Sequence, residues 1–466
     1  MDGIIKEKRN IFGDASFYKS VLKISVPIML QQLIQNMVSL IDNFMVSGLG
    51  DVSMSGVNVA GQILFIFMVF LNTICMSGGI FLTQFFGAKD KEGMKQAFIF
   101  KLFMGISAFI PYMLVCRVFP RQILSLLLIG NTQAPFILDE AVKYIRIMFW
   151  MGLPMTISVC IATSLRDMGR VKAPLVVTIV ATLTNTVFNY ILIYGHFGFP
   201  ALGVRGAAFA TVIARCVEFV IFVGIYIKVK PDYAVHIKDG IKINLKLFGE
   251  ILRKGALMLF CEMTWVMSET VNTAIFNGRG GAEVVSGMAS SFAIANLFFI
   301  AFGGIYSATS VIIGKTLGEG RLEEARKQKS WLLSGALIFG CVMMIVGFGT
   351  TAIVPVVFGR LSAGAVAICR TMVVVLSLFM PAWVYINAQQ AVARAGGDTK
   401  MGAYGDAAIT LVVLIPMILI LGKYTDIGPI QLFVCIKLVD FIKITIFHFW
   451  LKKEDWLKNL AEERTE

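Results

Sequence analysis

The chain has 466 residues, of which 57% are hydrophobic and 15% are charged. Soluble globular chains carry about 25% charged residues, so this composition excludes an ordinary soluble domain and predicts an all-α integral membrane protein. The formal net charge of +13 is expected when cytoplasmic loops face anionic lipid headgroups, so it gives no reason to expect nucleic acid as a partner.

The chain begins with a polar, charged stretch, residues 1–20, which predicts a cytoplasmic N-terminal tail rather than a cleavable signal peptide. Apolar blocks follow that are long enough to cross a lipid bilayer as helices, for which about 20 residues suffice. The twelve predicted helices span residues 21–48, 56–86, 95–119, 138–165, 173–196, 203–229, 248–277, 284–316, 326–352, 366–393, 401–422 and 430–452. A cytoplasmic C-terminal tail is predicted for residues 453–466.

Lysine and arginine predict the orientation of these helices. Most of the 42 basic residues lie in the two tails and in the connections that follow even-numbered helices, such as Lys89 and Lys91 in one connection and Arg326 in another. Because cytoplasmic loops carry the positive excess, we expect both termini in the cytoplasm and the protein in the cytoplasmic membrane.

The sequence repeats itself after about half its length. A shift that places the run from Leu22 onto the run from Leu252 aligns Gly48 with Gly278. Two six-helix lobes follow from this repeat, residues 21–229 and 248–452, joined by a cytoplasmic linker over residues 230–247. Parallel repeats of this kind usually enclose a central cleft, so transport is the function that the predicted architecture favours.

Three segments carry a resemblance to a known family. They are "SVPIMLQQLIQNMVSLIDNFMVSGLGDVSMSGVNVA" in the first predicted helix and the loop after it, "NTVFNYILIYGHFGFPALGVRGAAFATVIAR" in the fifth and sixth, and "RAGGDTK" after the tenth. Together they resemble the multidrug and toxic compound extrusion (MATE) family. The resemblance implies a secondary active antiporter that exports cationic, amphipathic organic compounds in exchange for H⁺ or Na⁺, with no cofactor.

Asp42 lies within the first predicted helix, where an ionised carboxylate costs a few kcal/mol unless it faces a polar site. By depth along outward-running helices, Asn185 and Asn189 are predicted to line one pocket with it. The resemblance assigns ion coupling to the matching Asp, with Asp42 and Asn189 as candidate Na⁺ ligands. Hydrogen bonding between helices is the structural alternative. Pro27, in the same helix, is predicted to act as a hinge.

The second half has two acids of its own. Glu262 and Glu269 lie seven residues apart on the seventh helix, hence nearly on one face. Glu262 matches an embedded Glu of the sodium-coupled bacterial branch, which implies a part in ion coupling or substrate binding. That branch pairs it with an acid on the tenth helix, where this chain has Trp383 or a neighbour. The polar side chains predicted there are Asn387, Gln389 and Gln390.

The remaining charges inside predicted helices are expected to be structural. Arg215 and Glu218 are spaced to neutralise each other, and Lys437, Asp440 and Lys443 repeat that spacing on the twelfth helix. Asp406 is expected to reach the cytoplasmic interface.

Methionine and aromatic side chains near the acids are predicted to bind bulky organic cations, because aromatic faces attract cations and Met adapts its shape. The candidate substrate-binding residues are Met37, Phe44, Met45, Glu262, Met263, Trp265, Met267, Glu269 and Asn387.

Two rival functions have different requirements from export. A flippase of lipid-linked oligosaccharides, from the same wider superfamily, would require a strongly cationic cleft. A membrane-embedded enzyme would need a converging catalytic constellation, which the scattered His and Cys residues do not form. We therefore expect a monomeric transporter that is not an enzyme.

Overall fold

The computed structural model describes residues 11–128, 133–235, 243–278, 281–358 and 361–462. Within these residues every regular element is helical. Residues 1–10 and 463–466 of the predicted tails and residues 236–242 of the predicted linker lie outside the described part of the chain.

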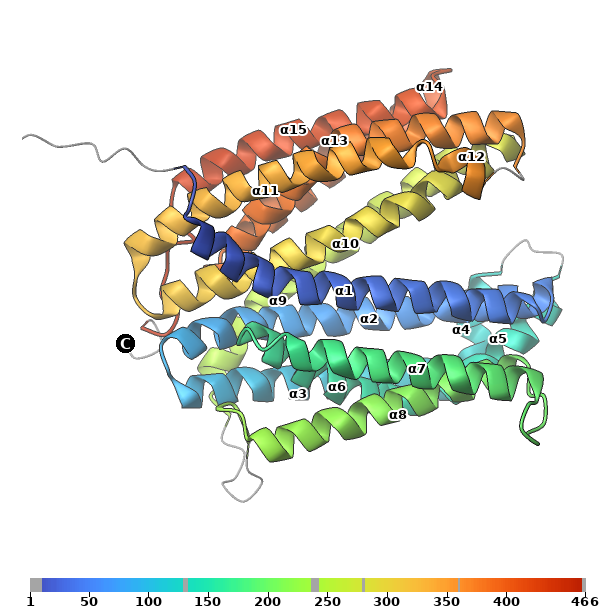
Figure 1. The fold of residues 1–466 in the computed structure, drawn as a ribbon, viewed down its shortest axis with the longest axis horizontal. Helices are drawn as coiled ribbons and strands as arrows, with labels where there is room; N and C mark the ends of the chain where they lie inside the picture. The colour runs from blue at the N-terminus through green and yellow to red at the C-terminus, as the bar shows by residue number, and fades with distance from the viewer. Residues whose placement is uncertain (1–10, 129–132, 236–242, 279–280, 359–360, 463–466) are drawn as a thin grey trace, which may run out of the picture. The chain divides into compact units, whose positions relative to one another are not determined.

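In the described part of the chain, twelve long helical segments match the twelve predicted spans (Figure 1). In the first half they are α1 Ala15–Ser47, α2 Asp51–Gly87, α3 Lys91–Met113 with η1 Leu114–Val118, α5 Ala134–Met148 with η2 Phe149–Met151 and α6 Gly152–Asp167, α7 Lys172–Tyr194 and α8 Val204–Val229. In the second half they are α9 Leu245–Gly278, α10 Ala282–Gly318, α11 Leu322–Thr350, α13 Ala363–Ala395, η4 Met401–Ala407 with η5 Thr410–Leu414 and α14 Ile415–Tyr424, and α15 Pro429–Lys452. The short helices α4 Pro120–Leu126 and α12 Val354–Val357 lie in connections.

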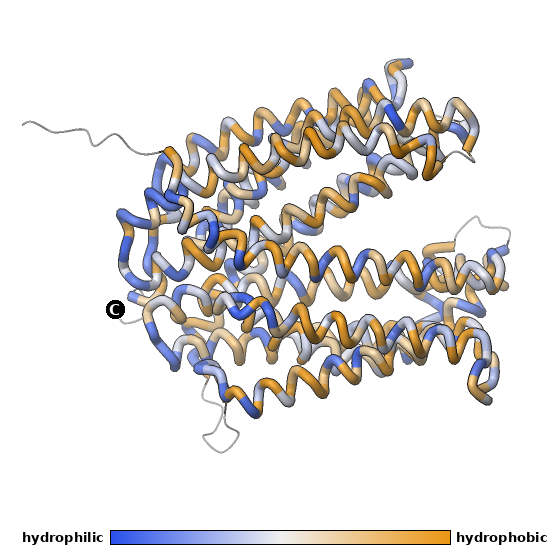
Figure 2. Tube along the Cα trace, viewed as in Figure 1, coloured by the Kyte–Doolittle hydropathy of each residue, from blue (hydrophilic) through white to orange (hydrophobic). Residues whose placement is uncertain are grey.

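The prediction of an all-α protein with twelve membrane-spanning helices is confirmed. Ten of the long segments are apolar enough by composition to cross a bilayer. Helices α9 and α15 are not among the ten because their sequences are more polar. Helix α9 contains Glu262, Glu269 and other polar residues, and α15 carries three charged residues near its middle, Lys437, Asp440 and Lys443. Figure 2 shows that hydrophobic residues dominate along the helices and that hydrophilic residues gather near their ends.

The chain divides into two compact units. We call residues 30–82 and 90–252 the N-terminal unit, and residues 1–29, 83–89 and 253–466 the C-terminal unit. Helices α1 and α2 therefore each contribute to both units, since α1 changes unit after Met29 and α2 after Leu82. The lobe boundaries drawn from the sequence repeat stay a prediction.

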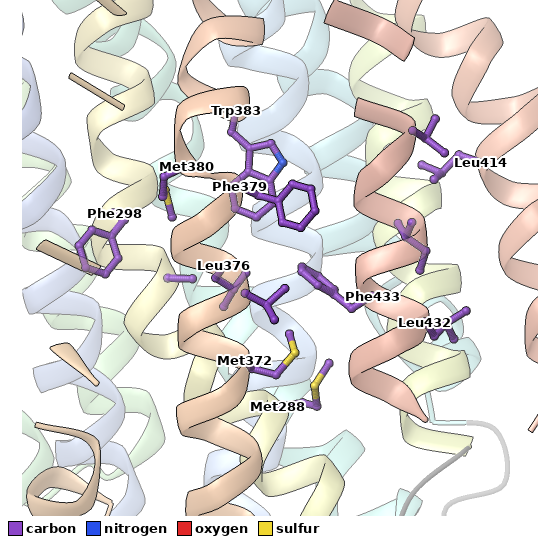
Figure 3. Packing of buried hydrophobic residues seen from close by; sticks show 14 of the residues in the cluster. Met288, Phe298, Met372, Leu376, Phe379, Met380, Trp383, Leu414, Leu432 and Phe433 are labelled. Carbon is purple, nitrogen blue, oxygen red and sulfur yellow. The ribbon is translucent and has the colours of Figure 1, made fainter. Parts of the chain in front are cut away.

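The C-terminal unit has an apolar core around α10, α13 and α15. Buried side chains there include Met288, Phe298, Met372, Leu376, Phe379, Met380, Trp383 and Phe433. Figure 3 shows Phe379 and Trp383 side by side on one helix and Phe433 on the neighbouring one. Within a bilayer, tight van der Waals packing of this kind holds helices together, because lipid tails are as apolar as the side chains.

A glycine allows α1 to approach α10 inside this unit. A Cβ atom on Gly304 would lie 2.5 Å from the Met29 Cγ and 2.9 Å from the Ser25 carbonyl oxygen. Small residues at such crossings let membrane helices pack backbone against side chain. The first half of α1 is thereby fixed to the helices of the C-terminal unit.

The described part of the predicted C-terminal tail, residues 453–462, is folded onto the C-terminal unit. Trp456 is fully buried, and both side-chain oxygens of Glu454 accept hydrogen bonds from the Arg326 guanidinium at 2.6 and 2.7 Å. The Leu460 amide donates to the Gln84 side chain at 2.8 Å, and Gln84 in turn donates to the Ala395 carbonyl at 2.8 Å. The tail thus joins the last turn of α2 to the end of α13.

The described part of the predicted linker is also anchored, in this case to the N-terminal unit. Tyr233 is fully buried, with its ring centroid 4.6 Å from that of Phe98 on α3. The Val235 amide donates to the Tyr226 hydroxyl at 2.7 Å. These contacts hold residues 231–235 against α3 and the end of α8.

Candidate functional site

The structure brings Asp42, Asn185 and Asn189 together inside the N-terminal unit. Asp42 lies on α1, and both asparagines lie one turn apart on α7. The Asn189 Nδ2 donates to Asp42 Oδ1 at 2.6 Å. With the Asn185 amide turned to the orientation that satisfies its partners, its Nδ2 donates to both Asp42 oxygens, at 2.8 and 3.0 Å. The carboxylate is therefore held by neutral amide donors.

The positive charge near Asp42, that of Arg215, is paired with another acid. Arg215 on α8 donates to Glu218 Oε2 at 2.6 Å, as the spacing of these two residues predicted. Within the described residues Asp42 forms no salt bridge. Hydrogen bonds and the more distant charge of Arg215 thus stabilise its negative charge, and no cationic side chain of the described residues pairs with it directly, so a cation or a proton can bind there.

Asn189 contributes a second acceptor to this site. Its side chain is 1% exposed, and its Oδ1 has no hydrogen-bond partner among the described residues. An orphaned buried carbonyl is unusual, because most buried polar atoms are satisfied. Together with the carboxylate of Asp42, this carbonyl provides the kind of oxygen ligands that hard cations take.

The other predicted residues of α1 make no contact with this site among the described hydrogen bonds and ion pairs. Met37 and Phe44 are exposed, Phe44 at 79%, and Met45 uses its backbone carbonyl to accept from the Tyr194 hydroxyl at 2.8 Å. Pro27 lies inside α1, two residues before Met29, where the helix changes unit. A proline there removes one backbone hydrogen bond, and its role as a hinge stays a prediction.

Glu262 has a cationic partner that spacing along the chain does not reveal. The Arg394 Nη1 lies 3.4 Å from Glu262 Oε1, and the Arg394 guanidinium lies 5.8 Å from the centroid of the Tyr306 ring. The sequence predicts the end of the tenth helix at residue 393, which places Arg394 in the loop after it. Helix α13 continues to Ala395, so this arginine lies in its last turn and its side chain is only 8% exposed.

An acid from another helix lies next to Trp383, which stands where the resemblance would place an acid that the tenth helix of this chain lacks. The Trp383 Nε1 donates to Asp440 Oδ2 on α15 at 2.8 Å. The Lys437 ammonium lies 4.8 Å from the centroid of the Trp383 ring. An acid therefore does lie next to this position, although α15 supplies it and not α13.

One expectation about the structural charges is wrong. Lys443 does not pair along its own helix but binds Asp406 Oδ1 on η4 at 2.7 Å. Asp406 also accepts from the Gln390 Nε2 at 3.1 Å, and its expected reach to the cytoplasmic interface stays a prediction. Charged side chains inside a membrane gain more from partners on neighbouring helices than from long extension to water.

The other polar candidates of α13 have separate roles. The Asn387 Nδ2 donates to the Trp383 carbonyl of its own helix at 2.9 Å. The Gln389 Nε2 donates to the Ile444 carbonyl on α15 at 3.4 Å. Of the three, Gln390 alone contacts a charged side chain in the described structure.

The remaining candidates lie along α9. Glu269 is partly exposed and has no hydrogen bond or ion pair within the described residues. Trp265 and Met267 are exposed, and Met263 is partly buried. Over the part of the chain that the structure describes, no hydrogen bond, ion pair or ring contact joins these four side chains. Among the described residues, no group of three or more His, Cys, Asp or Glu side chains forms a metal-binding cluster.

Arg394→Met is expected to destabilise the C-terminal unit, because it leaves Glu262 without its cationic partner. Removing one partner of a fully buried pair costs about 3–5 kcal/mol, and we expect about 1–2 kcal/mol here because the Glu262 side chain is 30% exposed. Thermal unfolding in detergent of Arg394→Met, Glu262→Gln and the double variant measures this. The double variant should lose less than the sum of the single losses, and strictly additive losses would contradict the pairing.

The family follows from comparison with known proteins. The family model MatE matches residues 27–191 and 258–420, which is more than half of the chain. The chain therefore belongs to the MatE family of membrane transporters.

Two relatives and one solved structure illustrate this membership. The probable multidrug resistance protein NorM of Pasteurella multocida is 26% identical over 428 residues, which cover 87% of each chain. A protein of the same name from Thermotoga maritima is 24% identical over 335 residues, 71% of this chain and 70% of the relative. A crystal structure of MATE in the bent conformation matches with a TM-score of 0.83 and 18% identity over 98% of both chains, which shows the shared fold.

Proposed function

We propose that this protein is a secondary active antiporter of the cytoplasmic membrane. It exports cationic, amphipathic organic compounds in exchange for H⁺ or Na⁺. Two relatives are named as multidrug resistance proteins, which supports export of foreign compounds. Both termini lie in the cytoplasm in this proposal, and a monomer is the working unit.

The observation that carries the proposal is the Asp42 carboxylate and its neutral partners. Asn185 and Asn189 supply hydrogen bonds but no positive charge. The charge is balanced when a proton, a sodium ion or the cationic group of a substrate binds. Because these occupants compete for one carboxylate, entry of the ion favours release of the substrate, and this competition couples the two fluxes.

The ligand chemistry allows both coupling ions. A proton needs only the carboxylate, whereas Na⁺ takes several oxygen ligands, for which Asn189 Oδ1 is available beside Asp42. We propose Asp42 as the principal coupling residue, with Asn185 and Asn189 as its ligating partners. Pro27 is proposed as the hinge of α1.

Substrate binding in this proposal uses the exposed apolar side chains near the acids. Phe44 and Trp265 present aromatic faces that attract organic cations, and Met37 and Met267 present flexible thioethers. Glu262 contributes its charge to the same task, moderated by Arg394. The rival flippase is less well supported, because the embedded cations Arg394, Lys443 and Lys101 all have acidic partners.

The test uses purified protein in liposomes that are loaded with a fluorescent organic cation. Efflux is followed under an imposed proton gradient and, separately, under an imposed sodium gradient. Efflux driven by one gradient identifies the coupling ion, and an ionophore that collapses that gradient should stop it. Efflux that responds to neither gradient, together with transfer of a fluorescent lipid-linked sugar between leaflets, would favour the flippase instead.

A further inference from the structure

Lys443 occupies a small oxygen-lined site inside the C-terminal unit. Its side chain is 11% exposed, and its ammonium donates to Asp406 Oδ1 at 2.7 Å and to Thr410 Oγ1 at 3.0 Å. The second oxygen of Asp406 accepts from Gln390 on α13 at 3.1 Å. The carboxylate of Asp406 and the hydroxyl of Thr410 thus contact the embedded positive charge of Lys443, and Gln390 on α13 holds the carboxylate from the other side.

The helix that carries these oxygens is locally widened. Asp406 lies in the π-helical segment η4, and Thr410 is the first residue of the second π-helical segment, η5. Such segments are rare and are found frequently at functional sites, because they re-aim side chains that a regular α-helix would turn away. Here both of the residues that contact the Lys443 ammonium lie in the π-helical stretches.

We propose that the Lys443 ammonium is a tethered substitute for a monovalent cation and fills a latent Na⁺ site made by Asp406 and Thr410. Carboxylate and hydroxyl oxygens are ligands that hard cations take from solution. An ammonium carries the same single charge, and because it is attached to α15 it stays at the site whatever the ion gradient.

The other acids of this part of the unit are also satisfied from within the chain. Glu262 has Arg394, and Asp440 accepts from Trp383 with Lys437 beside that ring. The C-terminal unit therefore needs no cation from solution to balance these embedded acids. Resting on the proposed function, this favours Asp42, rather than Glu262, Asp406 or Asp440, as the site at which the coupling ion binds.

Removing the ammonium should uncover the latent site. In Lys443→Ala the carboxylate of Asp406 loses its counter-charge, and the truncated side chain leaves space beside it. A small cation from solution then restores the balance and stabilises the folded state, because a ligand that binds only the folded protein raises its stability.

The experiment is done in the Asp42→Asn background, so that the N-terminal site does not contribute. Melting temperatures of full-length protein in detergent are compared in sodium chloride and in choline chloride at equal ionic strength. Lys443→Ala should melt several degrees higher in sodium than in choline, whereas the protein with native Lys443 should show no difference. Two matched controls remove the effect: Lys443→Met, whose side chain fills the space, and Lys443→Ala with Asp406→Asn, which removes the ligand.

A sodium response that is absent in Lys443→Ala, or that persists after Asp406→Asn, would overturn the proposal. Binding of ²²Na⁺ to the Asp42→Asn protein with native Lys443 tests the proposal without any Lys443 variant. We expect no bound sodium there, and bound sodium that Asp406→Asn removes would show that the site takes its cation from solution. These measurements read stability and binding, so they are independent of whether gradient-driven efflux is found.

Discussion

Asp42→Asn is expected to reduce ion-driven efflux in liposomes to the level of liposomes without protein. Asparagine has nearly the shape of aspartate but no charge, so it takes up no proton at neutral pH and offers a sodium ion no counter-charge. In the native protein the amides of Asn185 and Asn189 donate to the Asp42 carboxylate. The side-chain carbonyl of the substituted asparagine can accept from them in the same place. We therefore expect the variant to fold and to lose coupling.

The matched control is Asp51→Asn. Asp51 is an exposed acid at the first residue of α2, nine positions later in the chain. It should retain efflux under the same gradient. Melting temperatures of both variants should lie close to that of the unmodified protein. Undiminished efflux in Asp42→Asn would return this residue to a structural role and remove the basis of the proposed coupling.

Lys101→Met is expected to cause a larger loss of stability than any of the other single substitutions proposed. Lys101 on α3 is fully buried, and its ammonium contacts Asp167 Oδ2 at 2.6 Å and Ser164 Oγ at 3.1 Å on α6. Helix α2 passes directly over this pair, since a Cβ on Gly79 would lie 2.8 Å from Asp167 Oδ2. Removing the ammonium leaves Asp167 without this cation, at a cost of about 2–4 kcal/mol, because Lys101 is fully buried but the Asp167 side chain is 22% exposed.

Thermal unfolding measures this loss, and the second mutation tests its cause. Lys101→Met with Asp167→Asn should recover much of the stability, because no unpaired charge then remains inside the helices. Lys91→Met is the control on the same helix. Its ion pair with Asp232 at 3.0 Å is exposed, so its loss should cost less than about 1 kcal/mol. Equal losses for Lys101→Met and Lys91→Met would show that burial does not govern these pairs.

The sequence predicts local features well because the bilayer imposes them locally. A helix that crosses hydrocarbon must be apolar over its own length, so each of the twelve spans is visible without knowledge of its neighbours. Depth is equally local, since each residue advances a helix by about 1.5 Å. That regularity is why the sequence alone matches Asn185 and Asn189 with Asp42.

Side-chain partners on other helices cannot be predicted from hydropathy and depth. A single arginine marks the end of an apolar run and so predicts a loop at Arg394, yet Glu262, 132 positions earlier, pairs with it in the last turn of α13. Spacing along the chain indicates only which residues lie close together on one helix. It therefore predicts that Lys443 pairs with a residue of its own helix. In the structure its partners are Asp406 and Thr410 of another helix.

By itself, the sequence of this protein determined the membrane environment, the number of helices and the place of the embedded acids, since hydropathy and rise per residue are properties of one segment at a time. Only the tertiary structure decided which charges neutralise one another, where the C-terminal segment around Trp456 packs, and which acid is left to neutral partners. Those outcomes depend on distances between segments far apart in the chain, and the cost of an unpaired charge in hydrocarbon selects among them.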